Sequence, residues 1–293
     1  MPSRWTRWTD PVPSFGRPSP AAAMEPPLRS GADAASASYR AEGGTTGWCS
    51  LTAAAATGVG HRLAGEPGQD SYAWAVAGGR LAVAVADGLG SVPGSAEAAA
   101  AATRSAVQAA TAFAHGPPRH AATAGIDAAE AELRGWEAGR GATTLVVCVV
   151  DQGGEAALSR IGDSTAFVLG TGESSHWREL FDPPADHEEE MPVGTGALAS
   201  GEGRVSADEE TVEVTLRGSE VVAVVSDGVA GPWRDGPTTV APAMVEGLMG
   251  RPSPVELAAL VDFSRQGCHD DRTIVAIRPV GEWSGAELYK AEG

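Results

Sequence analysis

This 293-residue sequence is poor in features that would assign it to several large classes of protein. Aromatic residues make up only 5%, and 21 basic residues stand against 38 acidic ones, which gives a formal net charge of −17. Nucleic acids and anionic membranes both favour basic surfaces, so we expect neither as a partner. We also expect no membrane span and no secretory signal, because the sequence lacks the long apolar runs that these need.

Cysteine is scarce as well. The three cysteines, Cys49, Cys148 and Cys268, are odd in number and show no CxxC spacing. Cys148 lies inside an apolar run, so we expect it to be buried and unreactive. Such cysteine usage is typical of a reducing compartment and predicts a cytoplasmic location.

Composition divides the chain into three parts. Residues 1–46 are rich in Pro, Ser, Ala and Arg without sustained periodicity, and we expect them to be disordered. Residues 47–280 show the hydrophobic patterning of one folded domain, and residues 281–293 form a short tail. Within the domain we expect helices at 95–114, 120–135, 239–248 and 254–265, and strands at 71–76, 81–86, 143–150, 156–161, 166–169, 211–216, 221–225 and 273–278.

The order of these elements predicts an α+β fold. Two consecutive helices between blocks of strands favour antiparallel sheets with packed helices over alternating βαβ units. Residues 170–210 interrupt this order and lack a clear pattern, although they include the charged run DHEEE. A long unpatterned insertion of this kind indicates a lid or a mobile loop.

Acidic residues recur beside the ends of the predicted strands. VAVADG places Asp87 directly after an apolar run, VVSDG does the same for Asp227, and IGDS places Asp163. Asp70 in GQDS and Asp270 in HDDR come shortly before predicted strands. Since a buried carboxylate without a partner is costly, something positive is expected to meet them. Mg²⁺ and Mn²⁺ favour oxygen ligands, so these aspartates predict a metal site.

A purely structural interpretation of the same pairs stays open. Asp-Gly is the commonest hairpin-turn signal, so a single pair after a strand is more often a turn than a ligand. Asp87 and Asp227 each close an apolar run without alternation, as strands buried on both faces do. This feature favours the metal interpretation for these two residues.

Six motifs in this order resemble the metal-dependent protein phosphatase family (protein phosphatase 2C-like), in its bacterial branch. They are GQDSYAW, VAVADGLGS, GATTLVV, SRIGDS, VVSDGV and HDDRTIVAI, within residues 47–279. Each motif is weak alone, whereas their order is specific. The resemblance implies a four-layer α-β-β-α sandwich, in which helix pairs flank two antiparallel sheets. It also implies that phosphoserine and phosphothreonine in protein substrates are hydrolysed by water activated by two Mn²⁺ or Mg²⁺ ions, without a covalent enzyme intermediate.

The resemblance further implies roles for individual residues. Asp87 would bridge both ions, and the Gly88 carbonyl would bind one of them. Asp227 and Asp270 would bind the other, so Asp87, Asp227 and Asp270 are the expected catalytic residues. Asp70 matches an early acidic position near the ions and their waters, and it belongs to the expected metal-binding residues.

Three neighbouring positions are expected to have lesser roles. Asp163 matches a family position linked to a third, weaker ion. Asp271 stands where the family usually has asparagine and is expected to support Asp270 rather than bind an ion. His269 is expected to be a bystander, because these ions favour oxygen over imidazole.

Three residues depart from the family pattern. Gln69 stands where many members have glutamate, Gly65 where many have a phosphate-binding arginine, and Leu89 where some have a histidine that protonates the leaving group. Arg62 or His61 could supply the missing phosphate contact, although a structural role is the stronger alternative for His61. The departures keep a second hypothesis open, namely a catalytically weak or inactive member that binds phosphoproteins or regulates a partner. A third, an unrelated acidic cation-binding domain, would explain the aspartates but not their order.

Overall fold

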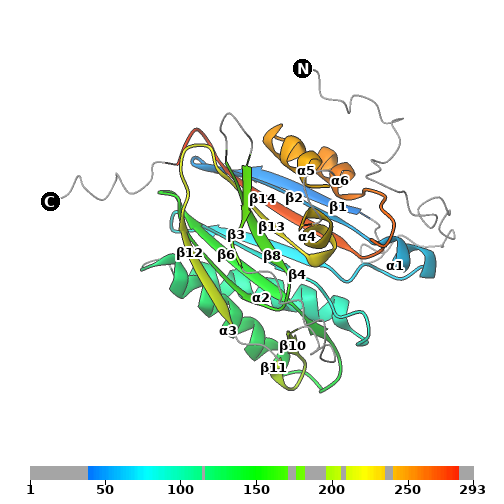
Figure 1. Cartoon of the computed structure of the whole chain (residues 1–293). Coiled ribbons are helices and arrows are strands. Elements are labelled where there is room, and N and C mark those ends of the chain that lie inside the picture. Colours follow the sequence, from blue (N-terminus) through cyan, green and yellow to red (C-terminus); the bar gives the residue numbers. More distant parts are fainter. Residues whose placement is uncertain are drawn as a thin grey trace, which may run out of the picture.

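The computed structural model describes residues 39–113, 116–170, 176–181, 196–205, 209–234 and 240–283. Two antiparallel sheets lie face to face in it, and helices cover the outer face of each (Figure 1). The predicted α+β class and the four-layer arrangement are therefore confirmed.

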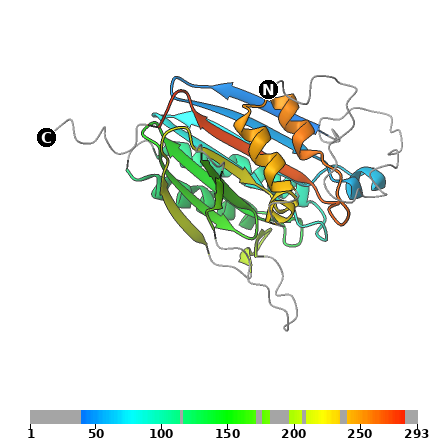
Figure 2. The same cartoon turned by 45° about the horizontal axis from the view of Figure 1, so that its top comes forward.

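The first sheet has six strands in the order β1-β2-β14-β13-β8-β9. Their bounds are Tyr39–Thr45, Cys49–Ala56, Arg272–Pro279, Val221–Val225, Thr165–Gly170 and His176–Glu179. Three helices, α4, α5 and α6, pack against this sheet on its outer side, and Figure 2 shows α5 and α6 lying across it. They span Asp227–Arg234, Val240–Met249 and Pro254–Val261.

The second sheet has five strands in the order β12-β7-β6-β4-β3. Their bounds are Glu210–Thr215, Glu155–Ile161, Leu145–Asp151, Arg80–Ala86 and Ser71–Ala77. The long helices α2 (Ser95–Ala112) and α3 (Pro118–Arg134) cover its outer face. Alanine is the strongest helix former and has a short side chain, so the alanine-dense α2 can lie close to the sheet. The buried residues of this layer include Ala98, Ala102 and Ala106.

A branched apolar core fills the space between the two sheets. Val83 and Val85 of β4 meet Val224 of β13 and Val275 of β14 in this layer, and all four side chains are fully buried. Strands buried on both faces explain the apolar runs without alternation in the sequence. The same packing fixes how the ends of the two sheets face each other.

Part of the segment predicted to be unpatterned forms three short strands. Besides β9, the hairpin of β10 (Ala197–Ala199) and β11 (Gly203–Val205) pairs with β5 (Ala142–Thr143) in a separate three-stranded sheet. The prediction of an unpatterned loop is therefore wrong for these strands. The DHEEE run lies outside the described residues.

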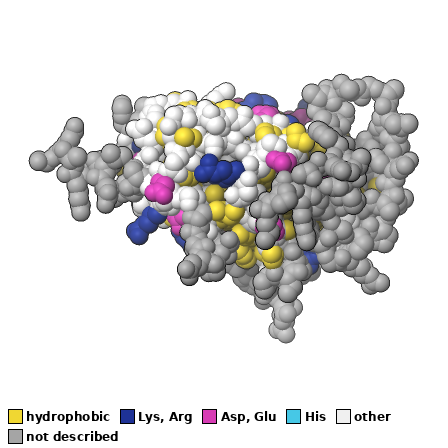
Figure 3. Space-filling view, turned by 90° about the horizontal axis from the view of Figure 1, so that it is seen from above, with side chains coloured by type: hydrophobic (Ala, Val, Ile, Leu, Met, Phe, Trp, Pro, Cys, Tyr) yellow, Lys and Arg dark blue, Asp and Glu magenta, His cyan; other side chains and the backbone are white. Residues whose placement is uncertain are grey.

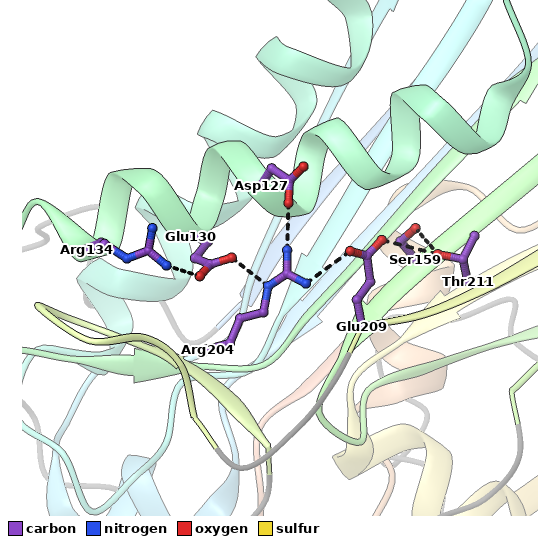
Figure 4. Close-up of polar contacts among 7 residues, drawn as sticks. All are labelled: Asp127, Glu130, Arg134, Ser159, Arg204, Glu209 and Thr211. Carbon is purple, nitrogen blue, oxygen red and sulfur yellow. Dashed lines mark hydrogen bonds and ion pairs between the residues drawn. The ribbon is translucent and has the colours of Figure 1, made fainter.

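Arg204 attaches this hairpin to the rest of the domain (Figure 4). Its guanidinium donates to Glu130 at 2.6 Å, to Asp127 at 2.6 Å and to Glu209 at 3.3 Å. Arg134 adds a further ion pair to Glu130. The hairpin is thus held against α3 on one side and beside the start of β12 on the other.

Two predicted boundaries need correction. β1 pairs with β2 from Tyr39↔Ala56 to Thr45↔Ser50, so the prediction of disorder is wrong for residues 39–45. At the other end, Trp283 is 4% exposed and its indole donates to the Glu220 carbonyl at 2.9 Å. The domain therefore extends to residue 283. Residues 1–38 and 284–293 lie outside the described part of the chain.

Charged side chains are scattered over the described surface of the face seen in Figure 3. Basic groups there stand apart from one another rather than forming one continuous patch. None of the helices in the described ranges is both long and apolar enough to cross a membrane.

Candidate metal centre

The predicted acidic residues lie at one end of the two facing sheets. Asp70 precedes β3 and Asp87 follows β4, and the two strands pair so that Ser71 faces Ala86. In the other sheet Asp227 follows β13 and Asp270 precedes β14, whose first residues pair with the last ones of β13. Antiparallel pairing therefore brings carboxylates from distant parts of the chain to one edge.

Ser226 joins the two sheets at this edge. Its hydroxyl donates to Asp70 Oδ2 at 2.7 Å and accepts the Thr273 amide at 2.9 Å. Its carbonyl accepts the amides of Val229 and Ala230 and so begins α4. One buried serine thereby positions the carboxylate of one sheet beside the helix that starts from the other.

The carboxylates interact strongly with one another. Burial raises the pKa of Asp87 well above its usual range, and the charges of Asp70, Asp227 and Asp270 raise it further. Burial likewise raises the pKa of Asp70 to about 8, with a further contribution from Asp271. Burial raises the pKa of Asp227 to about 6, while a hydrogen bond from Asp87 opposes that shift. Like charges close together in a site with little water disfavour ionisation, and a bound cation relieves this.

Three oxygens at this edge are suited to a cation. Gln69 Oε1, Asp70 Oδ1 and Asp227 Oδ1 are buried and have no hydrogen-bond donor. Buried acceptors are normally paired, and hard cations such as Mg²⁺ and Mn²⁺ bind carboxylate and amide oxygens. The donor set therefore fits such ions. Over the described ranges, no group of three or more Asp, Glu, His and Cys side chains is arranged so that it could hold a metal ion by itself.

Asp270 and Asp227 share a hollow of about 340 Å³. It lies between the start of α4 and the segment before β14, and Gly228, Cys268 and His269 also line it. Gly228 is necessary there, since a Cβ at this position would lie only 2.0 Å from the Asp271 carbonyl oxygen. This close contact places the α4 start directly against the Asp270 loop.

Asp271 anchors the segment before β3 instead of facing the hollow. Its carboxylate accepts the amides of Gly58 and Gln69, each at 2.5 Å, and contacts His61 Nδ1 at 3.1 Å. Burial raises the pKa of Asp271, but the hydrogen bonds from His61 and the two amides outweigh it and hold the pKa below its usual value. Its own amide donates to Asp270 Oδ1 at 2.9 Å, and its role in supporting Asp270 as a ligand stays a prediction.

The two candidates for a phosphate contact are engaged within the protein. Arg62 donates to Asp262 at 3.0 Å and to the Tyr39 hydroxyl at 2.7 Å. The imidazole of His61 is held by Asp271. Their role in binding phosphate stays a prediction. Gly65 has a local reason for its identity, because it ends α1 (Val59–Ala64) with a left-handed φ of 69°, which strains an arginine.

The loop after Asp87 is fixed by its backbone. Gly88 forms a bridge with Thr143, and a Cβ at Gly88 would lie 2.8 Å from the Ser95 carbonyl oxygen, so only glycine fits. The Leu89 amide donates to the Ala142 carbonyl at 2.9 Å. The Gly88 carbonyl is thereby held in a defined place beside Asp87.

Sequence reasoning missed the hydroxyl residues that hold these aspartates. Thr143 Oγ1 donates to the Asp87 carbonyl at 2.9 Å, and Thr144 Oγ1 accepts the Asp87 amide at 3.1 Å. Ser226 has the corresponding role for Asp70. The available signal was their place inside the same motifs, GATT and VVSDG.

The sequence over residues 57–263 matches the protein phosphatase 2C family. This chain belongs to that family. The predicted resemblance is thus confirmed, and metal dependence is general among protein phosphatases 2C. The individual ligand roles of the aspartates stay predictions.

Solved structures of bacterial phosphatases show the same fold. The PPM Ser-Thr phosphatase MsPP from Mycobacterium smegmatis, in complex with cacodylate, matches with a TM-score of 0.55 and 21% identity over 78% of this chain and 97% of its own. RsbX in complex with magnesium matches with a TM-score of 0.54 and 15% identity over 82% of this chain and all of its own (100%). A bacterial serine phosphatase matches with a TM-score of 0.55 and 17% identity over 79% of this chain and 98% of its own. No curated protein matches the sequence.

Proposed function

We propose that this protein phosphatase 2C hydrolyses phosphoserine and phosphothreonine in protein substrates with two Mn²⁺ or Mg²⁺ ions, and that a third ion binds more weakly near Asp163. The observation that supports this most is the set of buried oxygens on Gln69, Asp70 and Asp227 that lack hydrogen-bond donors. They lie among carboxylates that raise one another's pKa, which is an environment that a divalent cation stabilises.

Each aspartate has a place suited to its proposed role. Asp87 interacts electrostatically with Asp70 on its own sheet and with Asp227 on the other, so it would help to hold both ions. Asp227 and Asp270 line one hollow and would hold the second ion between them. The Gly88 carbonyl would bind the first. When bound, the ions lower the pKa of water and neutralise charge that develops on the phosphoryl oxygens.

Asp70 would help to bind the ions and the waters that they carry. Ser226 fixes one of its oxygens, and the other is buried and free of hydrogen bonds. A cation bound beside Asp70 would stabilise the ionised form of this carboxylate, which burial disfavours. The 340 Å³ hollow beside Asp227 and Asp270 would give a phosphoryl group access to this edge.

Phosphate release from a phosphothreonine peptide tests the proposal. The purified chain should release phosphate with Mn²⁺ or Mg²⁺ and not in EDTA, and Asp87→Asn should abolish turnover. Glu213→Gln is a matched control, because it makes the same change of carboxylate to amide at a half-exposed ion pair on β12. No turnover by the wild-type chain at millimolar Mn²⁺ would contradict the proposal.

A second candidate is a weak or inactive phosphatase-fold protein that binds phosphoproteins or regulates a partner. Two residues favour this candidate. Gln69 is neutral where many members of the family carry a charge, and Gly65 has a left-handed backbone conformation. Titration calorimetry separates the two candidates. Binding of Mn²⁺ and of a phosphopeptide without hydrolysis would establish the second, whereas binding with hydrolysis supports the first.

A further inference from the structure

Thr144 holds the backbone of Asp87 and is itself almost fully buried. Its amide donates to the Asp87 carbonyl at 2.8 Å, and its hydroxyl accepts the Asp87 amide at 3.1 Å. The side chain is 1% exposed. A hydroxyl has one proton and two lone pairs, so after accepting the Asp87 amide it can still make a second hydrogen bond.

The second hydrogen bond joins Thr144 to the loop that carries Asp163. Thr144 Oγ1 lies 2.8 Å from Ser164 Oγ, and Ser164 is fully buried. Gly162, on the other side of Asp163, makes room for the same side chain, because a Cβ there would lie 2.7 Å from Thr144 Cγ2. Thr144 is therefore enclosed by the residues that flank Asp163.

We infer that Thr144 and Ser164 form a positioning pair that couples the Asp87 loop to the Asp163 loop, so that the affinity for the divalent ion near Asp163 depends on the place of Asp87. The inference rests on the proposed function, since it concerns ions that those aspartates would bind. Neither hydroxyl is a proposed ligand. Thr144 acts through its hydrogen bond to the backbone amide of Asp87. Ser164 acts as the chain neighbour of Asp163.

The physical reason is the close packing of Thr144 against the residues that flank Asp163. In a close-packed interior, a small displacement of one loop is passed on to its neighbour, because no void absorbs it. Asp163 also raises the pKa of Asp227 through its charge, so its place affects the second sheet as well. Removing residues that orient metal ligands typically weakens metal binding by roughly 10- to 100-fold.

Calorimetric titration of the full chain with Mn²⁺ tests the inference with three variants. Thr144→Val keeps the shape and removes the hydroxyl, Thr144→Ser keeps the hydroxyl, and Ser164→Ala removes only the link to the second loop. Ser159→Ala is the matched control. Ser159 is also fully buried, and its hydroxyl lies 2.8 Å from Thr211 Oγ1 between β7 and β12 (Figure 4).

We expect Thr144→Val to raise the Mn²⁺ dissociation constant roughly 10- to 100-fold, and Thr144→Ser and Ser159→Ala to stay within about threefold of wild type. Ser164→Ala should weaken the weaker binding event more than the tighter ones. Asp163→Asn should have a smaller effect in the Thr144→Val background than in the wild type, because the coupling is already lost there.

Wild-type affinity in Thr144→Val, a loss in Thr144→Ser or Ser159→Ala as large as the one in Thr144→Val, or additive effects of Asp163→Asn and Thr144→Val would each overturn the inference. Melting temperatures in EDTA identify a variant that fails to fold. If Thr144→Val does, the comparison of Ser164→Ala with Ser159→Ala decides. A wild-type chain that takes up no Mn²⁺ contradicts the proposed function itself, whereas a wild type that binds Mn²⁺ beside unaffected variants contradicts only the coupling.

Discussion

Gly58 and His269 touch through their backbones, so closely that a Cβ on Gly58 would lie 2.3 Å from the His269 carbonyl oxygen. The same Cβ would lie 2.4 Å from the carbonyl carbon of Asp270. Gly58 also donates its amide to Asp271. The segment before α1 thus lies directly on the loop that positions Asp270.

Gly58→Ala is expected to displace the Asp270 loop and to raise the Mn²⁺ concentration for half-maximal activity at least tenfold. The substitution brings no backbone strain, since φ is −61° there, so its effect comes from the contact alone. Gly60→Ala is the control, because its Cβ would lie 3.6 Å from the same oxygen, an ordinary contact. Equal metal requirements in the two variants would show that Asp270 is not positioned by this contact.

Ser226→Ala is expected to lower both stability and metal affinity. It leaves Asp70 Oδ2 and the buried Thr273 amide without their partner, which typically costs about 1–3 kcal/mol for each unsatisfied group. Denaturant unfolding and Mn²⁺ titration measure the two effects. Ser71→Ala removes a neighbouring buried hydroxyl that contacts Thr103 instead, so it should leave the Mn²⁺ affinity unchanged. A fall in stability alone would assign Ser226 to folding and not to the site.

Gln69→Glu is expected to lower the metal concentration needed for half-maximal rate, because it adds a negative charge where Oε1 is buried without a donor. Steady-state rates across a Mn²⁺ series give this concentration. Gln152→Glu makes the same change at the exposed turn between β6 and β7, which lies at the opposite end of the sheet. An unchanged or raised requirement in Gln69→Glu would place Gln69 away from the ions.

The metal-free protein is expected to lose stability as the pH rises from about 4 to about 8. Burial raises the pKa of Asp227 to about 6 and that of Asp70 to about 8, whereas aspartate in an unfolded chain titrates near about 3.9. Over this window the folded state binds more protons than the unfolded state, so rising pH favours unfolding. Melting temperatures in EDTA should therefore fall across the window.

Mg²⁺ should reverse this loss, because it binds the ionised carboxylates of the folded state only. The rise in melting temperature on adding Mg²⁺ is expected to grow with pH over the same range. Asp70→Asn should flatten the fall seen in EDTA. A melting temperature that climbs with pH in EDTA would mean that these carboxylates are not buried together.

Strongly patterned elements could be predicted from the sequence, and elements with weak local signals could not. The apolar runs of β4 and β13 and the alanine-dense α2 carry their own signals, and all three form where expected. β2 has the sequence CSLTAAAA. Alanine has a low strand propensity, so the sequence gives little local strand signal and tertiary packing stabilises this strand. α4 holds Pro232 and two glycines, so its helical periodicity is not visible.

The aspartates could be located beside strand ends, but their convergence depends on strand pairing. Asp70 and Asp227 are far apart in the sequence and meet through Ser226, which itself shows no pattern. The same limit applies to Asp271, whose three partners come from the segment before β3. Backbone contacts of this kind between distant segments produce no periodic pattern in the sequence.

Asp70 and Asp87 adjoin one sheet, whereas Asp227 and Asp270 adjoin the other. A cation bound by carboxylates from both sheets would link the two halves of the sandwich. This link could form only after the two sheets have packed against each other. Cation binding should then slow amide hydrogen exchange in the central strands β4 and β13 together, and by the same factor. The phosphatase would in this way become competent only in molecules whose two halves have already closed on each other.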